Sequence, residues 1–446
     1  MPWESSGLPG LFSITERPLL GLWLGLCVLH MPFAKADDVW DMRIKAEAIH
    51  SDNGALVSDD QAEADWIART ELHNRIRFER EHHSLKSNYR IINHNFSNDT
   101  QNDNTIVEGQ TEWYWEPVDQ RFAMTADHSR FRLVRDNTER FTEDNQDQRT
   151  ITSVGPTSRI KLSAVDALEL STSWTDVNYA DGGSQNSDRW ISGVSWIHAL
   201  SPISTAYLSL THQSVDFDSE RAGYDYYQLS GTYLRRLRNV EWSIQLGRNK
   251  IERDSGTRFS GFSSALSLDW SKGYHRVKLG ALADITDSSL GNRNQSLVGD
   301  IDLGMQFDFD SEFREPDATD RTSVEMLWET QRWVCDFCAT TVFFRRVSEE
   351  FLTSGAKRSQ TISKIALTVQ PSNARRYIFA YEPFEFERRT DAEKASQRQD
   401  RWQFSAFHKA MRDLELGFQL SWRERDGNSV KSEELRSALS LEYSLF

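Results

Sequence analysis

The chain has 446 residues, a net charge of −15 and a mean hydropathy of −0.61. Nucleic-acid phosphates need a basic surface, so this acidic balance argues against nucleic acid as a partner. A helical membrane protein of this size would show several runs of about 20 apolar residues, whereas the sequence has one shorter run, Leu19–Phe33, near its start.

That apolar run has the features of a secretory signal peptide. Arg17 precedes it, and Ala34-Lys35-Ala36 follows it with the small-x-small pattern that a signal peptidase cuts. We therefore interpret residues 1–36 as a signal that is cleaved before Asp37, with an uncleaved anchor as the alternative. No linker rich in Pro, Gly or Ser divides the remainder, so residues 37–446 are predicted to form a single domain.

Alternation of apolar and polar residues begins directly after the signal. A first strand is expected over Val39–Ile49 and a second over Asp65–Glu79, with the polar stretch Ser51–Glu63 between them. One face of the second segment is apolar, and the other carries the candidate lumen-lining residues Arg69, Glu71, His73, Arg75, Arg77 and Glu79. Each unpaired ion of that face would cost several kcal/mol in a dry core. A watery lumen would solvate the face, and neighbouring strands could pair its opposite charges.

From this point short and long connections alternate along the chain. The short ones are Arg80–His83, Pro117–Gln120, Ala164–Asp166, Ser201–Ser204, Arg238–Asn239, Lys272–Gly273, Cys335–Cys338, Pro371–Ala374 and Lys409–Ala410. The longer ones are acidic or rich in Asn: Ser97–Asn104, Arg135–Gln148, Asp181–Asp188, Asp218–Gly223, Asp254–Gly256, Leu352–Ala356, Arg389–Gln399 and Asp426–Ser432. Outer-membrane barrels have short periplasmic turns and longer extracellular loops. A soluble β-sandwich, the alternative for alternating strands, has no reason to keep this rhythm.

The segment 287–320 interrupts the rhythm. Counting strands from both ends makes it one outer connection, although Ser296–Asp310 has an alternation of its own. It is an extra hairpin above the membrane, or a segment that folds into the lumen, or a sign that the count is wrong. On the first two interpretations the sequence predicts an all-β fold, a transmembrane antiparallel β-barrel of about 20 strands within a range of about 16 to 22.

Cys335-Asp336-Phe337-Cys338 is the sharpest local motif. A redox pair would need the start of a helix to lower the thiol pKa, but strands are predicted on both sides. A zinc site would need a second pair of ligands, and no other cysteine remains once Cys27 leaves with the signal. In an exported chain we expect a disulfide between Cys335 and Cys338 that closes a tight hairpin.

No other motif points to chemistry. His82, His83 and His94 are scattered, and surface histidine is the simpler interpretation beside a metal role. Ser192-Gly193-Val194-Ser195 lacks the glycine spacing and the following helix of a nucleophile elbow. We therefore predict no catalytic residue, no cofactor, no metal site and no enzymatic activity.

The last stretch has the clearest alternation. Leu414, Leu416, Phe418, Leu420 and Trp422 share one face, and the pattern returns from Leu435 to Leu445. Two such strands ending at an aromatic residue are what the closing hairpin of an outer-membrane barrel needs. The 15 tryptophans lie mostly near predicted strand ends, as expected for rings at the two membrane–water boundaries, although aromatic residues are common in strands of every kind.

The laid-out strands resemble a known family. The resemblance is carried by the early loop Ser51-Asp52-Asn53, by Tyr89–Asp103, where a strand runs into an Asn/Asp loop, and by the turn Leu200-Ser201-Pro202 before Thr205–Leu210. These features are similar to those of the outer-membrane barrels associated with PEP-CTERM/exosortase and exopolysaccharide gene clusters. The ending Tyr443-Ser444-Leu445-Phe446 departs from the common final pattern of that family by one extra residue, and no functional residues carry over.

The resemblance implies an outer-membrane protein that supports exopolysaccharide export or cell-surface and biofilm assembly. The alternatives are a general diffusion porin for small solutes, and a non-conducting barrel that binds a partner through its loops or plugs itself with 287–320. The expected partners are outer-membrane lipid, lipopolysaccharide, the barrel-assembly machinery and, on the first interpretation, polysaccharide export components. The expected location is the cell outer membrane.

Overall fold

The computed structural model describes residues 38–134, 142, 145–180, 186–218, 223–287, 318–390, 394–427 and 431–445. Residues 39–446 make up one compact unit, whose described part is a 20-stranded sheet with one short 3-10 helix, η1 (Asp59–Gln61). The strands are β1 Val39–Ser51, β2 Asp65–Glu79, β3 His83–Phe96, β4 Asn104–Val118, β5 Phe122–Val134, β6 Gln146–Lys161, β7 Asp166–Tyr179, β8 Ser187–Ser201, β9 Ser204–Phe217, β10 Tyr224–Arg236, β11 Val240–Arg253, β12 Arg258–Lys272, β13 His275–Asp287, β14 Ala318–Gln331, β15 Cys338–Phe351, β16 Lys357–Ser372, β17 Arg375–Arg389, β18 Lys394–Met411, β19 Leu414–Gly427 and β20 Lys431–Ser444.

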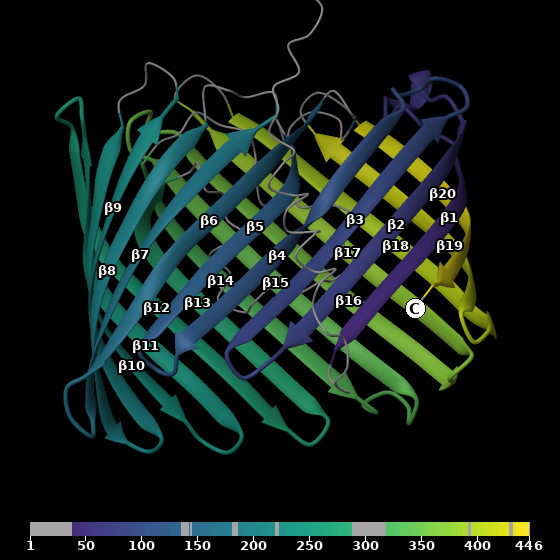
Figure 1. The fold of residues 1–446 in the computed structure, drawn as a ribbon. Helices are drawn as coiled ribbons and strands as arrows, with labels where there is room; N and C mark the ends of the chain where they lie inside the picture. Colours follow the sequence, from purple (N-terminus) through teal and green to yellow (C-terminus); the bar gives the residue numbers. More distant parts are fainter. Residues whose placement is uncertain are drawn as a thin grey trace, which may run out of the picture. The chain divides into compact units, whose positions relative to one another are not determined.

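The sheet closes on itself. Each strand pairs antiparallel with the next along the chain, from β1 with β2 to β19 with β20. The last strand also pairs with the first, from Arg43 opposite Ser444 to Ser51 opposite Arg436. Figure 1 shows the resulting ring of tilted strands, in which each strand has a partner on both sides. This closed 20-stranded antiparallel barrel confirms the predicted fold class and strand number.

The two rims of the barrel differ in their connections. At one rim, here called the turn rim, the chain reverses through 80–82, 119–121, 162–165, 202–203, 237–239, 273–274, 332–337, 373–374 and 412–413. The opposite rim, here called the loop rim, carries the longest connections, which include 52–64, 97–103, 135–145 and 288–317. β1 begins and β20 ends at the turn rim, because β1 runs into the loop-rim connection 52–64 and β20 is its antiparallel partner.

One predicted loop is mostly strand. The sequence predicts a loop over Arg389–Gln399, but β17 continues to Arg389 and β18 begins at Lys394. The exposed Glu385, Glu387 and Arg398 explain the difference. They alternate with the luminal residues of these strands and extend the sheet beyond its apolar part, with a composition that is typical of loops.

The interrupted segment is one connection between two paired strands. Ala318 of β14 lies opposite Asp287 of β13, so both strands continue further than the sequence indicates and 288–317 joins them. The expected alternation over Ser296–Asp310 lies outside the described residues. The pairing of β13 with β14 keeps the strand number even, as the count from both ends of the sequence requires.

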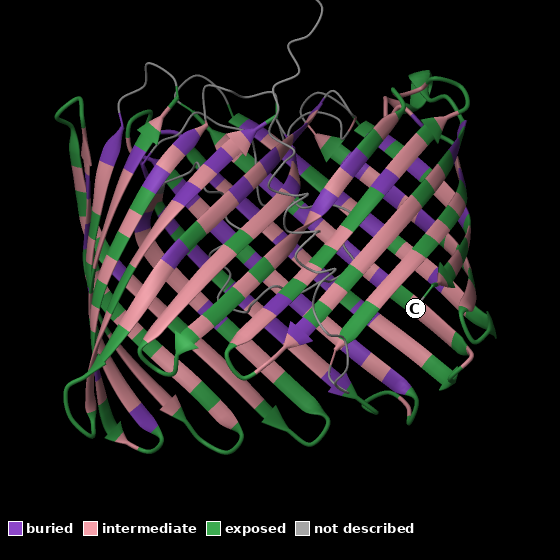
Figure 2. Ribbon diagram, in the orientation of Figure 1, coloured by how far each residue is buried: buried purple, intermediate pink, exposed green. Residues whose placement is uncertain are grey.

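Side chains alternate between an outward and a luminal face along each strand, which produces the stripes of different burial in Figure 2. The register of the paired strands places every tryptophan of the described strands on the outward face. These are Trp40, Trp66, Trp113, Trp115, Trp174, Trp190, Trp196, Trp242, Trp270, Trp328, Trp402 and Trp422. Random placement on two faces would not give this result, so the outer face is a chemically distinct surface.

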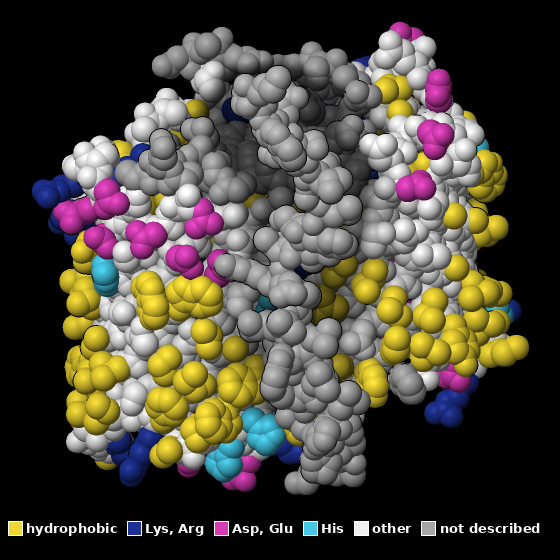
Figure 3. Space-filling model, turned by 45° about the horizontal axis from the view of Figure 1, so that its top comes forward, with side chains coloured by type: hydrophobic (Ala, Val, Ile, Leu, Met, Phe, Trp, Pro, Cys, Tyr) yellow, Lys and Arg dark blue, Asp and Glu magenta, His cyan; other side chains and the backbone are white. Residues whose placement is uncertain are grey.

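The outward tryptophans lie near the two edges of an apolar band. Towards the loop rim, Tyr381 and Trp402 stack with ring centroids 4.2 Å apart, and Trp402 lies opposite Trp422. Towards the turn rim, the rings of Trp113 and Trp115 lie 6.2 Å apart. Figure 3 shows the hydrophobic band between charged regions. A closed barrel with such a band is an outer-membrane protein, because lipid can cover only apolar side chains and a sheet without free edges.

Candidate functional site: the luminal wall

The face opposite the tryptophans lines the lumen and carries ion pairs between neighbouring strands. Arg345 on β15 lies 3.1 Å from Glu325 on β14, and both side chains are less than a tenth exposed. Arg358 on β16 donates from Nε to Glu349 on β15 over 2.7 Å. Each acid thus meets its base across the strand pairing, where opposite charges stabilise a sheet.

Glu382 on β17 holds two cations at once. Lys364 on β16 lies 2.8 Å from one carboxylate oxygen, and Arg401 on β18 lies 3.3 Å from the other. All three side chains are about nine-tenths buried or more. Their burial in one contact makes this group a strong constraint on the register of β16, β17 and β18.

The pairs continue past the closing strands. Arg423 on β19 lies 3.4 Å from Glu434 on β20, whose other oxygen accepts a 2.8 Å hydrogen bond from Ser51 on β1. Arg90 on β3 lies 2.8 Å from Glu108 on β4. Paired charges therefore line the wall from β14, through the junction of β20 with β1, as far as β4.

The candidate lumen-lining residues predicted from the sequence lie along β2 in this wall. Arg69 donates to Glu47 over 2.7 Å and to Glu71 over 2.8 Å. His73 Nε2 lies 2.6 Å from the side-chain oxygen of Asn88 on β3. Nearer the turn rim the side chains are more open: Arg75 is exposed opposite Asp41, and Arg77 pairs with Glu79 at 3.0 Å.

The wall from β6 to β12 has a different chemistry. Small hydroxyl side chains pair across the strands there: Ser153 with Thr175, Ser195 with Ser209, and Ser243 with Ser267, at 3.0, 2.8 and 2.7 Å. Gln228 reaches Ser263 over 3.4 Å. The wall from β6 to β12 therefore adds short neutral polar pairs to long charged side chains such as the buried Arg149 and Arg189.

Sequence reasoning missed an apolar cluster on the luminal face. It consists of Leu327, Phe343, Ile362, Phe384 and Phe386, from β14 to β17, each 8% exposed or less. Apart from Glu382 and Glu385, the run from Tyr381 to Phe386 is apolar on both faces of the strand. This departure from alternation was the signal in the sequence that could have indicated an apolar luminal patch. The expected rule of polar side chains inside the barrel therefore does not hold at this place.

The end of β13 leans over the luminal side of its neighbours. The pairing with β12 stops at Ala283, although both strands continue. Ile285 then packs against Val215, Tyr224 and Ile251, which the register places on the luminal face. The strand that leads into connection 288–317 thus bends toward the lumen.

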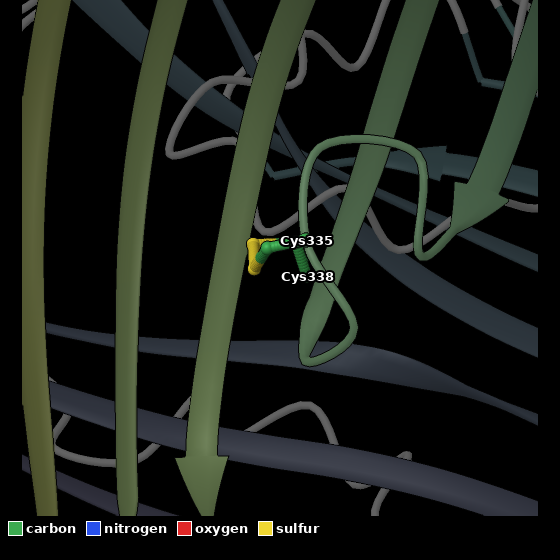
Figure 4. The surroundings of a disulfide bond; sticks show 2 residues. All are labelled: Cys335 and Cys338. Carbon is green, nitrogen blue, oxygen red and sulfur yellow. A yellow bond between two sulfur atoms is a disulfide. The ribbon is translucent and has the colours of Figure 1, made fainter.

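Cys335 and Cys338 are joined by a disulfide in the turn between β14 and β15 (Figure 4). Cys338 is the first residue of β15, and its amide donates to the Cys335 carbonyl over 3.0 Å. The bond lies at the turn rim, away from the luminal charges. It belongs to the closure of one hairpin and not to a reactive site in the wall.

The part of the chain that the structure describes contains neither a metal-binding cluster nor a membrane-spanning helix. No group of three or more His, Cys, Asp or Glu side chains there is arranged to hold a metal ion. Among the same residues no helix has the length and apolarity needed to span a membrane. His82, His83 and His94 do not come together: His94 contacts Asn104 at 2.9 Å, whereas His83 stacks on Phe78 at the turn rim.

No protein-family model and no curated protein matches the sequence. Among solved structures, the chain is similar to the FrpB iron transporter of Neisseria meningitidis, with 7% identity and a TM-score of 0.45 over 91% of this chain and 82% of that one. It is also similar to the siderophore receptor PirA of Pseudomonas aeruginosa, with 11% identity and a TM-score of 0.43 over 93% and 81%. OccK2 of the same organism, solved with glucuronate, gives 10% identity and 0.41 over 92% and 99%.

These similarities reach the barrel architecture and no further. The assignment to the outer membrane rests on the closed sheet and its apolar band. Membership of the PEP-CTERM/exosortase-associated family stays a prediction from the sequence.

Proposed function

We propose that the barrel is a conduit through which small polar solutes diffuse across the outer membrane. The observation that supports this proposal is the contrast between the two faces of the strands. Apolar and aromatic side chains cover the outside, while paired charges and hydroxyls cover the lumen. Ions lose several kcal/mol each when they are moved to a dry interior, so a wall of this composition suits water and hydrated solutes.

The strand number leaves two possibilities open. Barrels of about 16 to 18 strands leave an aqueous channel, and those of about 22 hold a plugged lumen. The connection 288–317 is the largest one at the loop rim, and the strand leading to it bends toward the lumen at Ile285. Removing that connection is therefore the most informative change for separating a conducting barrel from a plugged one.

Conductance in planar lipid bilayers tests the proposal. The wild-type chain is compared with a variant in which 290–316 is replaced by a short Gly-Ser linker, which leaves the paired residues Asp287 and Ala318 in place. A second variant that shortens another loop-rim connection, 218–223, controls for the loss of any rim loop. Stepwise conductance of the wild type is the expected result. Conductance by the 290–316 variant alone would favour the plugged alternative, and silence of all three would contradict the conduit.

Support of exopolysaccharide export or surface assembly is the second candidate, and the family resemblance is what favours it. Neighbouring genes for glycosyltransferases or an exosortase would strengthen it, and such a role would add polysaccharide export components as partners. Lipid, lipopolysaccharide and the barrel-assembly machinery are proposed as partners on either function, because any outer-membrane barrel must be inserted and then surrounded by them.

A further inference from the structure

A small pocket in the luminal wall gathers arginines from strands at both ends of the chain. It lies below the loop rim, between β19 and β20 on one side and β2 to β6 on the other, and has a volume of about 90 Å³. Its polar side chains include Arg69, Arg132, Arg423, Arg436, His94 and Glu434. The arginines come together only because the barrel closes, since β20 brings Arg436 opposite Ser51 of β1.

Basic groups outnumber acidic ones around this pocket. Arg69 shares Glu47 with Lys45, which lies 2.8 Å from the same carboxylate. Arg132 shares Glu108 with Arg90, at 3.5 and 2.8 Å. Glu71 and Glu434 supply two further carboxylates, so the described residues named here comprise six basic side chains and four acids. This local excess stands out in a chain whose net charge is −15.

Arg436 is the cation that makes the excess sharpest. Within the described residues it forms no ion pair within 4.0 Å and no hydrogen bond; Glu434 and Glu47 attract it from a greater distance, and Arg401 and Arg69 repel it. Arg69 also keeps one buried guanidinium nitrogen, Nε, without an acceptor. Buried donors without acceptors are costly, so the described residues around Arg69 and Arg436 can accommodate a further negative charge.

Ordered loops roof the pocket at the loop rim. Gly54 and Leu56 of connection 52–64 and Gln101 of connection 97–103 line it from above. Gln101 donates to the Gly54 carbonyl over 2.6 Å, which ties the two connections together. The Asn53 side chain donates to the Val57 carbonyl over 2.8 Å. The roof is thus held by its own hydrogen bonds, and the pocket does not depend on a mobile cover.

We propose that this pocket binds a small oxyanion, the carboxylate or phosphate group of a solute. Guanidinium groups bind such oxygens with charge-assisted hydrogen bonds and match their planar geometry. On the same measure one water needs about 10–15 Å³, so a pocket of about 90 Å³ has room for a phosphate-sized group. The inference rests on the proposed conduit, in which the pocket would be a binding site for anionic solutes along the path through the lumen.

Calorimetric titration of the full mature barrel in detergent with inorganic phosphate, and separately with acetate, tests the inference. Arg436→Gln should weaken binding at least tenfold, and it leaves no acid unpaired. Glu434→Gln should tighten binding severalfold, because it removes the carboxylate that competes for Arg423. Arg159→Gln is the matched control: it removes the same charge from the luminal phase of β6 at an exposed site near the turn rim, and binding should not change.

The outcomes separate this site from the conduit. Failure of the wild type to bind either anion, or equal binding by Arg436→Gln and Arg159→Gln, overturns the site even if the barrel conducts. Binding that depends on Arg436 in a barrel that never conducts keeps the site and removes the conduit. Heat-dependent migration on gels shows that each variant is folded before titration. If Arg436→Gln does not fold, the opposite shift expected for Glu434→Gln still decides the question.

Discussion

Replacing Leu439 by arginine asks what surrounds the outer face of the barrel. Leu439 lies on β20 opposite Phe418 and Ala48, and 64% of its surface is exposed. The outward apolar run of the neighbouring strand extends from Leu414 to Trp422. At about 3.4 Å per residue that run is about 27 Å long, and at a tilt of about 40° it covers about 21 Å of membrane thickness. Leu439 lies near its middle.

An arginine at the bilayer midplane costs about 2–4 kcal/mol of barrel stability. Each 1.4 kcal/mol is about a factor of ten, so Leu439→Arg should lower the folding equilibrium constant by about 30- to 700-fold. Leu435→Arg, near the Trp422 boundary, should cost about 1 kcal/mol or less. Reversible urea unfolding in phospholipid vesicles, followed by tryptophan fluorescence, measures both free energies.

Gln419→Arg is the matched control, because Gln419 lies on β19 beside Phe418 but on the luminal face. Water in the lumen should solvate that arginine at little cost in the free energy of unfolding. If Leu439→Arg unfolds no more easily than Gln419→Arg, the outer face meets water and the membrane assignment is wrong.

Three other changes have defined outcomes. Glu382→Gln removes the carboxylate that two buried cations share and should lower the free energy of unfolding by about 3–5 kcal/mol in the urea assay; an unchanged midpoint would contradict the ion-pair geometry. Hydrogen bonds from the Phe96 amide and a neighbouring side-chain amide lower the pKa of Asp103 below 3.8, so its contribution is present above pH 3.8 and is lost as the pH falls through the lower folded pKa. Amide exchange of loop 97–103 should therefore accelerate only in strong acid, and Asp103→Asn should remove that pH dependence. Cys338→Ser opens a bond to Cys335 that spans only three positions, so the barrel should remain folded and lose at most about 2 kcal/mol, as measured by the same unfolding curves.

Sequence alternation predicted the architecture because the two solvents of the barrel differ so strongly. The contrast between Leu414–Trp422 and their polar neighbours holds along β19 in the structure. The alternation of short and long connections predicted about 20 strands within a range of about 16 to 22, and the barrel has 20. The predicted loop over Arg389–Gln399 was wrong because the contrast between the two faces ends at the edge of the apolar band. Above the apolar band both faces meet polar surroundings, so a strand and a loop have the same composition there.

The luminal pocket could not be predicted from the sequence, because it depends on register between distant strands. Arg423 and Arg436 fall in the polar phase of the final hairpin, and Arg69 falls in the polar phase of the second strand. No local feature of the sequence places these three arginines at the same height along the barrel axis. That height is set by the pairing of β20 with β1 and by the tilt of the whole sheet. The luminal cluster around Phe384 was missed because the expectation of a polar lumen was applied to every strand, and no face was assigned to the residues of this one.

The pairing of β1 with β20 also governs the order of assembly. Arg43 and Glu442, which hydrogen-bond across this seam, are separated by 399 positions in the chain. The hydrogen bonds between β1 and β20 can form only after the whole polypeptide has reached the membrane. Contacts between such distant segments are slow to form. Until then two unsatisfied strand edges face each other in or near lipid, where they can pair with another chain. A chain truncated within β20 would keep those edges permanently, and it should accumulate as oligomers rather than as a smaller ring.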